Sequence, residues 1–176
     1  DFENLTKDNI YVLESPILSN SQYKKFLNYF KDTFKVLDCT FNVQNNLKER
    51  LDQLCSEAEI AVREGCKHLI LSDKQLSEKK AAIPMILAFG AINSKLVNSG
   101  IRGFVSINVQ TGEVLDTHSF AVLLGVGATT INPYLVFDSI YQRYEKKLFG
   151  KFSYLECIQR YIKSVDNGLL KIMSKM

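Results

Sequence analysis

Apolar, β-branched and aromatic residues gather in four short runs along the chain, and each run has the length and composition of a buried strand. The first run includes Val36, Leu37, Cys39 and Phe41. The predicted strands are residues 34–41, 68–72, 104–109 and 128–131. Between these runs the apolar period lengthens from two to three or four, so we expect a helix after each strand.

The segments outside the strands carry the spacing and the end signals of helices. Apolar residues recur every three or four positions from Leu47 to Ala61, and Gly65 is expected to end this helix in a left-handed conformation. Further helices are predicted at about 21–30, 83–98, 117–124, from 133 to a break at 150, and at 153–165, with an interruption at 167–168 before 169–176.

Three of these helices have recognisable first residues. Pro84 stands where a helix tolerates proline, in the first turn. Thr117 is the predicted N-cap of the helix that ends near Leu124. Asn132 precedes Pro133, and we expect Asn132 to cap the next helix while Pro133 takes its first position.

A repeated order of strand and helix with short connections is typical of crossover units, which form a parallel sheet. We therefore predict an α/β fold: a mostly parallel sheet of about four strands with crossover helices, half-barrel or flavodoxin-like, with extra helices at both ends. No low-complexity segment or linker divides the chain, so we expect a single domain over residues 1–176. The segment through Phe30 is expected to pack outside the sheet.

Composition and charge argue against two classes of partner. The 22 Lys and Arg residues are interleaved with 19 Asp and Glu, whereas a nucleic-acid-binding protein concentrates basic residues on one face. No window approaches the ~18 consecutive apolar residues of a membrane span. Residues 1–4 lack the features of a signal peptide, and the chain does not begin with Met, so we expect a piece of something longer.

Residue types that bind metals or phosphates occur, but not in the patterns that such sites need. The four cysteines form no C-x-x-C pair, and we interpret them as reduced structural thiols. His68 and His118 have no partner at ligand spacing, so no metal site is predicted. Gly125 and Gly127 lead from a helix into a strand, the reverse of a phosphate-binding loop, and they predict a tight turn.

Polar residues follow the predicted strands at the edge where open α/β sheets bind ligands. They are Thr40, Asp73, Asn108 and Asn132, with His118 at the start of a nearby helix. Asp73 is the best candidate for an acid, although a residue after a strand more often bonds to its own loop. No Ser or Cys has the setting of a nucleophile. The residues alone leave open a free-standing small-molecule-binding or hydrolytic domain that uses Asp73, His118 and Asn132.

An ordered series of motifs resembles the central domain of the glutamate synthase large subunit. AIPMILAFGA at 82–91 resembles the alanine-rich helix of that family, and LGVGA at 124–128 with INPYL at 131–135 is similar to another of its segments. Further matches are SPILS at 15–19, LSD at 71–73, GIR at 100–102, GE at 112–113, DTH at 116–118 and NGLLKIMSKM at 167–176.

The resemblance implies a non-catalytic, interdomain part of an enzyme that makes glutamate from glutamine and 2-oxoglutarate, with NAD(P)H or ferredoxin as reductant. The parent would also contain a glutamine amidotransferase domain, a flavin barrel with FMN and an iron–sulfur cluster, and a β-helix. It would work with an NAD(P)H-oxidising small subunit or with ferredoxin, in the cytoplasm or in a plastid. Residues 166–176 would begin the linker toward the flavin domain.

No catalytic, cofactor-binding or metal-binding residue is carried over to this chain, and the isolated segment is expected to be inactive. The chain also departs from the family pattern in two places. Asn93, Ser94 and Lys95 stand where the family has histidines, and Ser119 replaces a second histidine after His118. We interpret these as packing or surface positions.

Overall fold

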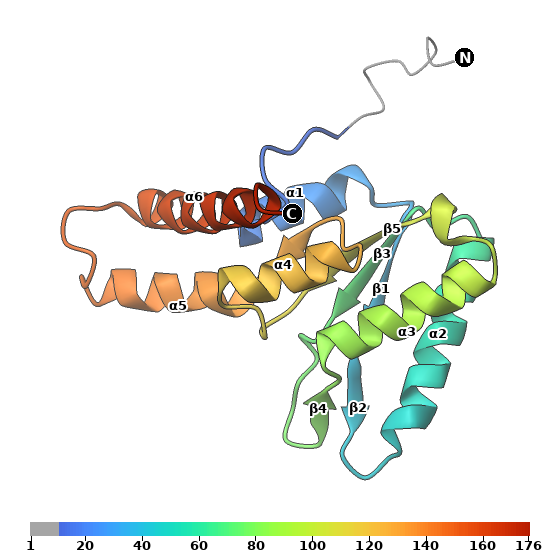
Figure 1. The fold of residues 1–176 in the computed structure, drawn as a ribbon. Helices are drawn as coiled ribbons and strands as arrows, with labels where there is room; N and C mark the ends of the chain where they lie inside the picture. The colour runs from blue at the N-terminus through green and yellow to red at the C-terminus, as the bar shows by residue number, and fades with distance from the viewer. Residues whose placement is uncertain (1–10) are drawn as a thin grey trace.

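The computed structural model describes residues 11–176, whose strands form two sheets (Figure 1). The larger sheet has four parallel strands in the order β1–β3–β5–β6. Their bounds are Phe34–Asp38 for β1, His68–Ser72 for β3, Ser106–Gln110 for β5 and Ile131–Asn132 for β6. The prediction of a parallel α/β sheet is confirmed.

One helix connects each strand of this sheet to the next. These helices are α2 (Leu47–Arg63), α3 (Met85–Asn98) and α4 (Thr117–Gly125). Because the strand order follows the chain order, right-handed crossovers place all three on one face of the sheet. This unreversed order is that of a half-barrel, since a flavodoxin-like sheet reverses direction at a switch point.

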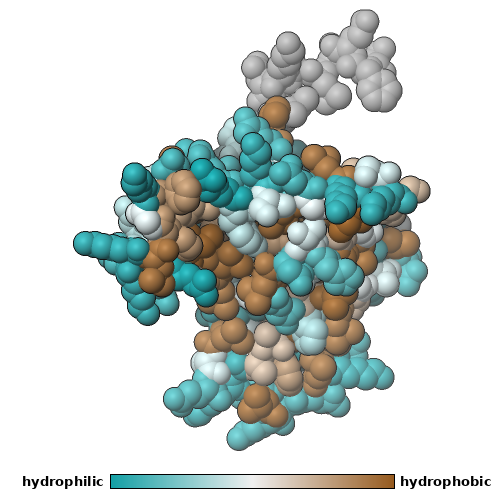
Figure 2. Space-filling model, turned by 60° about the vertical axis from the view of Figure 1, so that its left-hand side comes forward, coloured by the Kyte–Doolittle hydropathy of each residue, from teal (hydrophilic) through white to brown (hydrophobic). Residues whose placement is uncertain are grey.

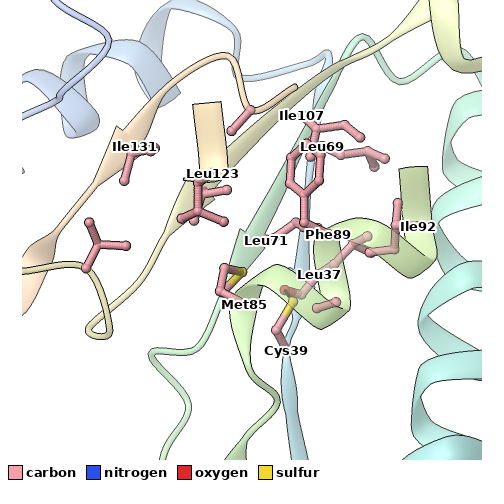
Figure 3. Packing of buried hydrophobic residues seen from close by; sticks show 14 of the residues in the cluster. Leu37, Cys39, Leu69, Leu71, Met85, Phe89, Ile92, Ile107, Leu123 and Ile131 are labelled. Carbon is pink, nitrogen blue, oxygen red and sulfur yellow. Dashed lines mark hydrogen bonds between the residues drawn. The ribbon is translucent and has the colours of Figure 1, made fainter. Parts of the chain in front are cut away.

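Side chains on β3 alternate between the two faces of the sheet. Leu69 and Leu71 point toward the crossover helices, where they join Phe89 and Ile107 in the main core (Figure 3). Ile70, between them, packs with residues of α1 on the opposite face. Covering on both faces explains why β3 is apolar at successive positions.

The helix on the opposite face is α1 (Asn20–Tyr29), close to its predicted place. Ser19 and Gln22 form a capping box at its start, which satisfies backbone donors of the first turn. Just before it, Ile17 pairs in parallel with Ile131 of β6. The N-terminal segment therefore continues the sheet beyond its last strand before α1 crosses back toward β1.

The sequence pattern does not predict the second sheet. β2 (Thr40–Asn42) pairs antiparallel with β4 (Lys80–Ala82), at the lower end of the molecule in Figure 1. The predicted strand at 34–41 is thus two strands, and the predicted loop at 73–82 contains β4. The break follows Asp38, whose Oδ1 accepts hydrogen bonds from the backbone N (3.1 Å) and Oγ1 (2.7 Å) of Thr40.

The start of α4 differs from its prediction by one residue. The N-cap is Asp116, whose carboxylate accepts hydrogen bonds from the backbone N and the Oγ of Ser119, both at 2.8 Å. The predicted cap at Thr117 is therefore wrong, and Thr117 is the first residue of the helix. Ser119, at one of the positions that depart from the family pattern, serves the cap.

The last two helices are α5 (Tyr134–Glu145) and α6 (Tyr154–Met173), and α6 runs without a break through the interruption predicted at 167–168. A Cβ at Gly168 would lie 2.6 Å from Thr117 Cγ2, so this glycine permits close packing of α6 on α4 rather than ending the helix. Ser15 Oγ donates to Asp166 Oδ1 (2.8 Å), which joins the N-terminal segment to α6.

The surface carries both polar and apolar areas. Figure 2, in which the α5–α6 end is turned forward, shows brown apolar areas among the teal polar ones. Within residues 11–176, none of the helices combines the length and the hydrophobicity needed to cross a lipid bilayer.

Candidate functional site

The four strands of the large sheet end in polar residues that lie side by side. Asp38, Ser72, Gln110 and Asn132 are paired across the sheet in register at its carboxyl edge. The last three are buried, and Asn132 exposes only 1% of its surface. Because strand side chains alternate, this row faces the same side as Ile70, toward α1 and away from the main core.

Hydrogen bonds join three of these residues into a chain. Ser72 Oγ donates to Gln110 Oε1 (2.8 Å), and Gln110 Nε2 donates to Asn132 Oδ1 (3.1 Å). Asn132 Nδ2 donates in turn to Leu18 O (2.8 Å) and to Asn20 Oδ1 (3.0 Å). The amide of Asn132 therefore uses both of its donor hydrogens within the protein.

The predicted capping role of Asn132 is wrong. α5 begins at Tyr134, Pro133 occupies the N-cap position, and the cap has no side-chain hydrogen bond. The side chain of Asn132 points instead toward β5 and the segment before α1, as its partners Gln110 and Leu18 show. The Asn-Pro pair predicted that this side chain would bond to the start of α5. It bonds instead to buried partners from distant parts of the chain.

Asp73 follows β3 directly and is also buried, with 1% of its surface exposed. Its carboxylate accepts hydrogen bonds from Thr111 Oγ1 and from the backbone N of Gly112, the latter at 3.0 Å to Oδ2. Burial, together with the nearby negative charge of Asp73, raises the pKa of Tyr134 far above its usual value. Asp73 thus orders the loop after β5, which is the loop-bonding role that its position favours.

The other polar strand residues are bonded to protein partners as well. Thr130 Oγ1 donates to Asn108 Oδ1 (2.8 Å), and Asn108 Nδ2 donates to Leu69 O (3.3 Å). Thr40 Oγ1 donates to Asp38 Oδ1. The polar groups that the sequence places at this edge therefore form a satisfied structural network, which offers little to a reacting molecule.

His118 does not join this network. It is exposed near the start of α4 and lines a cavity of about 250 Å³ together with Met85 and Glu113. Asn132 lines a different cavity, and Asp73 lines neither. The structure thus does not bring Asp73, His118 and Asn132 together as one cavity lining.

A cavity of about 830 Å³ opens at the row, between the sheet, α1 and α5. Its charged lining includes Lys24 of α1, Lys74 of the loop after β3, and Asp138 of α5. Charges of both signs beside buried amides could hold a polar molecule by hydrogen bonds. The cavity lining contains no Cys or His, and its Ser72 hydroxyl is committed to Gln110 rather than to a base.

His68 is enclosed by aromatic rings instead of ligands. Its ring centroid lies 3.9 Å from that of Phe30 and 5.6 Å from that of Phe26. In the part of the chain that the structure describes, no three His, Cys, Asp or Glu side chains group as a metal site. All four thiols are free, and burial raises the pKa of Cys39 to about 12, so this thiol stays protonated.

Arg102 is a structural residue that the periodicity does not reveal. Its guanidinium donates to Asn93 Oδ1 (2.7 Å), to Val105 O (2.7 Å) and to Gly127 O (3.2 Å). It thereby fastens α3 to the segments that lead into β5 and β6. In the sequence, the signal that points to Arg102 is its place in the GIR motif. Asn93, which stands where the family pattern has a histidine, supplies one of its hydrogen-bond acceptors.

Comparison with known proteins gives a consistent answer over nearly the whole chain. Residues 2–176 match the family model described as the glutamate synthase central domain. The NADPH glutamate synthase large chain of Azospirillum brasilense is 44% identical over 99% of this chain, and the chloroplastic ferredoxin-dependent glutamate synthase of Oryza sativa subsp. japonica is 40% identical over 93%.

The same matches cover only a small part of those proteins. The chain spans 12% of the Azospirillum protein and 11% of the rice protein, and 11% of the NADPH glutamate synthase large chain of Bacillus subtilis (strain 168), to which it is 36% identical. The family match, however, extends over nearly all of this chain. The chain therefore belongs to the glutamate synthase central domain family.

Proposed function

We propose that this chain is a non-catalytic, interdomain module of a glutamate synthase. The parent enzyme would make glutamate from glutamine and 2-oxoglutarate. The names of the relatives, an NADPH and a ferredoxin-dependent glutamate synthase, support NADPH or ferredoxin as the reductant. Because the chain corresponds to 12% or less of those relatives, the amidotransferase and flavin centres would lie in other domains of the same polypeptide.

The observation that carries this proposal is the state of the polar residues at the carboxyl edge of the sheet. Asp73, Asn108 and Asn132 are each at most 2% exposed and are hydrogen-bonded to other parts of the protein. A catalytic acid or base must reach the substrate proton, directly or through one water. Side chains that are buried and already paired hold the sheet, the loops and α1 together instead.

The described residues of this chain offer few groups that would hold the cofactors of the parent enzyme. An iron–sulfur cluster is held by cysteine thiolates, whereas Cys39 is buried with a raised pKa, and the described residues hold no group of metal ligands. Gly127, with φ +108°, ends α4 in a tight turn toward β6 rather than opening a helix toward a phosphate. We therefore assign FMN and the cluster to other domains.

The test uses the full-length enzyme with Asp73→Asn or His118→Ala. Asp73→Asn replaces a carboxylate that accepts bonds from Thr111 and Gly112, so we expect the free energy of unfolding to fall by about 1–3 kcal/mol. The exposed His118→Ala should change stability little. In both variants, kcat per folded enzyme for glutamine-dependent glutamate formation should equal that of the wild type.

A large loss of activity in either variant would contradict the proposal. Loss of a general acid or base lowers the rate by about 10²–10⁴-fold. A drop of that size in either variant, at a temperature where calorimetry shows the enzyme fully folded, would mean that this region takes part in the reaction.

A further inference from the structure

An apolar groove lies where the C-terminal half of α6 passes α4 and the N-terminal segment. It encloses about 600 Å³. Its walls include Ala121 and Leu124 of α4, Pro16 of the N-terminal segment, and Leu170 and Met173 of α6. These side chains come from three separate parts of the sequence, so the groove exists only in the folded molecule.

The α6 wall of this groove is unusually apolar for a surface. Leu170 exposes 62% of its surface and Met173 exposes 68%, whereas Leu169, the residue just before Leu170, is buried in the main core. An ordinary surface helix has one apolar stripe and a polar opposite face. Here the last turns of α6 expose Leu170, Ile172 and Met173 at the groove, where a surface helix would ordinarily present polar side chains.

The relatives and the path of the chain indicate what covers the outer side. The Azospirillum relative is much longer than the matched segment, which is 12% of that protein. α6 ends at Met173, and Met176 also lines the groove, so a polypeptide that continues from α6 leaves directly at the groove. Methionine side chains adapt to irregular partners, which suits an interface between domains.

We infer that this groove is the docking surface for an apolar face of the domain that follows in the same polypeptide. The inference rests on the proposed interdomain function and names its contact surface. The lining also includes the charged residues Lys163 and Asp166 beside the apolar ones, and specific interfaces likewise combine apolar and polar groups. The inferred partner is therefore an apolar helix or loop with a polar border, held in place by its covalent connection.

The test is thiol labelling of the full-length enzyme at single positions. Leu170→Cys and Met173→Cys place thiols in the groove, and Leu155→Cys is the matched control, because Leu155 lies on the same helix, is the same residue type as Leu170 and has the same exposed fraction of 62%. Each variant is treated with iodoacetamide under native conditions, and alkylation of the corresponding peptide is followed by mass spectrometry.

If the following domain covers the groove, labelling at 170 and 173 will be at least about tenfold slower than at 155, because it requires local opening. The inference is wrong if all three positions label at one rate, fast or slow. It is also wrong if the protection disappears on dilution, since a second copy would then cover the groove. Labelling does not depend on turnover, so this result is separate from the activity of the Asp73 variant.

Discussion

His68 places a titratable ring in an aromatic environment at the start of β3. Its Nδ1 is buried without a hydrogen-bond partner, and its ring stacks on Phe30 of the segment that follows α1. Burial, with a smaller contribution from the charge of Lys67, lowers the pKa of His68 below the usual 6.5. The folded protein therefore binds this proton less readily than the unfolded chain does.

We predict that stability falls as the pH drops below about 6.5, because the unfolded state then takes up a proton that the folded state excludes. Urea unfolding at pH 7.5 and pH 5.5 measures the difference. His68→Phe should keep the aromatic packing and reduce the acid-dependent loss relative to the wild type. An unchanged pH dependence in His68→Phe would show that other groups cause it.

At the scale of elements, the start of α3 depends on a residue from another loop. Pro84 occupies the N-cap position and provides no side-chain hydrogen bond. The backbone N of Met85 donates instead to Glu113 Oε2 (2.9 Å), from the loop between β5 and α4. The loop after β5 thus supplies a hydrogen-bond acceptor to the first turn of α3, the preceding crossover helix. This contact joins two successive crossover units.

We predict that Glu113→Ala lowers the free energy of unfolding by about 0.5–2 kcal/mol, the usual effect of losing a cap. Glu113→Gln keeps an acceptor oxygen and loses only the charge at the helix terminus, so its effect should be about 0.3–1 kcal/mol. Chemical denaturation of both variants is the measurement. Equal losses in the two would point to the charge rather than to the hydrogen bond.

At the scale of the whole molecule, Asn132 joins parts that are far apart in the sequence. It links β6 to β5 through Gln110, and to the segment before α1 and the first residue of α1 through Leu18 and Asn20, more than 100 positions away. These contacts join β6, its neighbour β5 and the N-terminal part of the chain into one unit. Their loss should therefore weaken the packing of the N-terminal segment as well as the sheet.

We predict that Asn132→Ala costs about 1–3 kcal/mol for each buried group left unpaired, which can exceed the loss of a surface cap. Hydrogen exchange should become faster at residue 18, whose backbone N bonds to Ile131, and in α1. Asn132→Asp keeps the acceptor for Gln110 but replaces the donor to Leu18 and Asn20 with a buried oxygen, so it should destabilise the protein at least as much as Asn132→Ala. A loss confined to α5 would instead favour a capping role.

The sequence predicts those parts of the fold whose pattern lies within one short segment of the chain. The parallel strands and their crossover helices leave a periodic pattern within each segment, and this pattern located β1, β3 and β5, whereas β6 lies at the end of the strand predicted at 128–131 and shares only Ile131 with it. β2 and β4 are three residues each and pair across about 40 positions, so neither leaves such a pattern. Asn132 and Gly168 carry local signals for a cap and a helix end, but contacts with distant residues decide both.

The candidate site divides in the same way. Periodicity predicts where a strand ends, so the sequence placed Asp73 and Asn132 correctly at the carboxyl edge of the sheet. It does not predict the direction in which a helix begins, and His118 lies in a different place. That these polar groups are bonded to each other, through Gln110 and Thr111, depends on the register between strands. A single sequence does not state that register.

The hydrogen bond between Ser15 and Asp166 holds the N-terminal segment against α6. It brings together two points that are 151 positions apart, while β2 and β4 lie at the far end of the molecule (Figure 1). Breaking this hydrogen bond would therefore free the N-terminal segment from α6, and the groove that both of them line would lose its fixed shape.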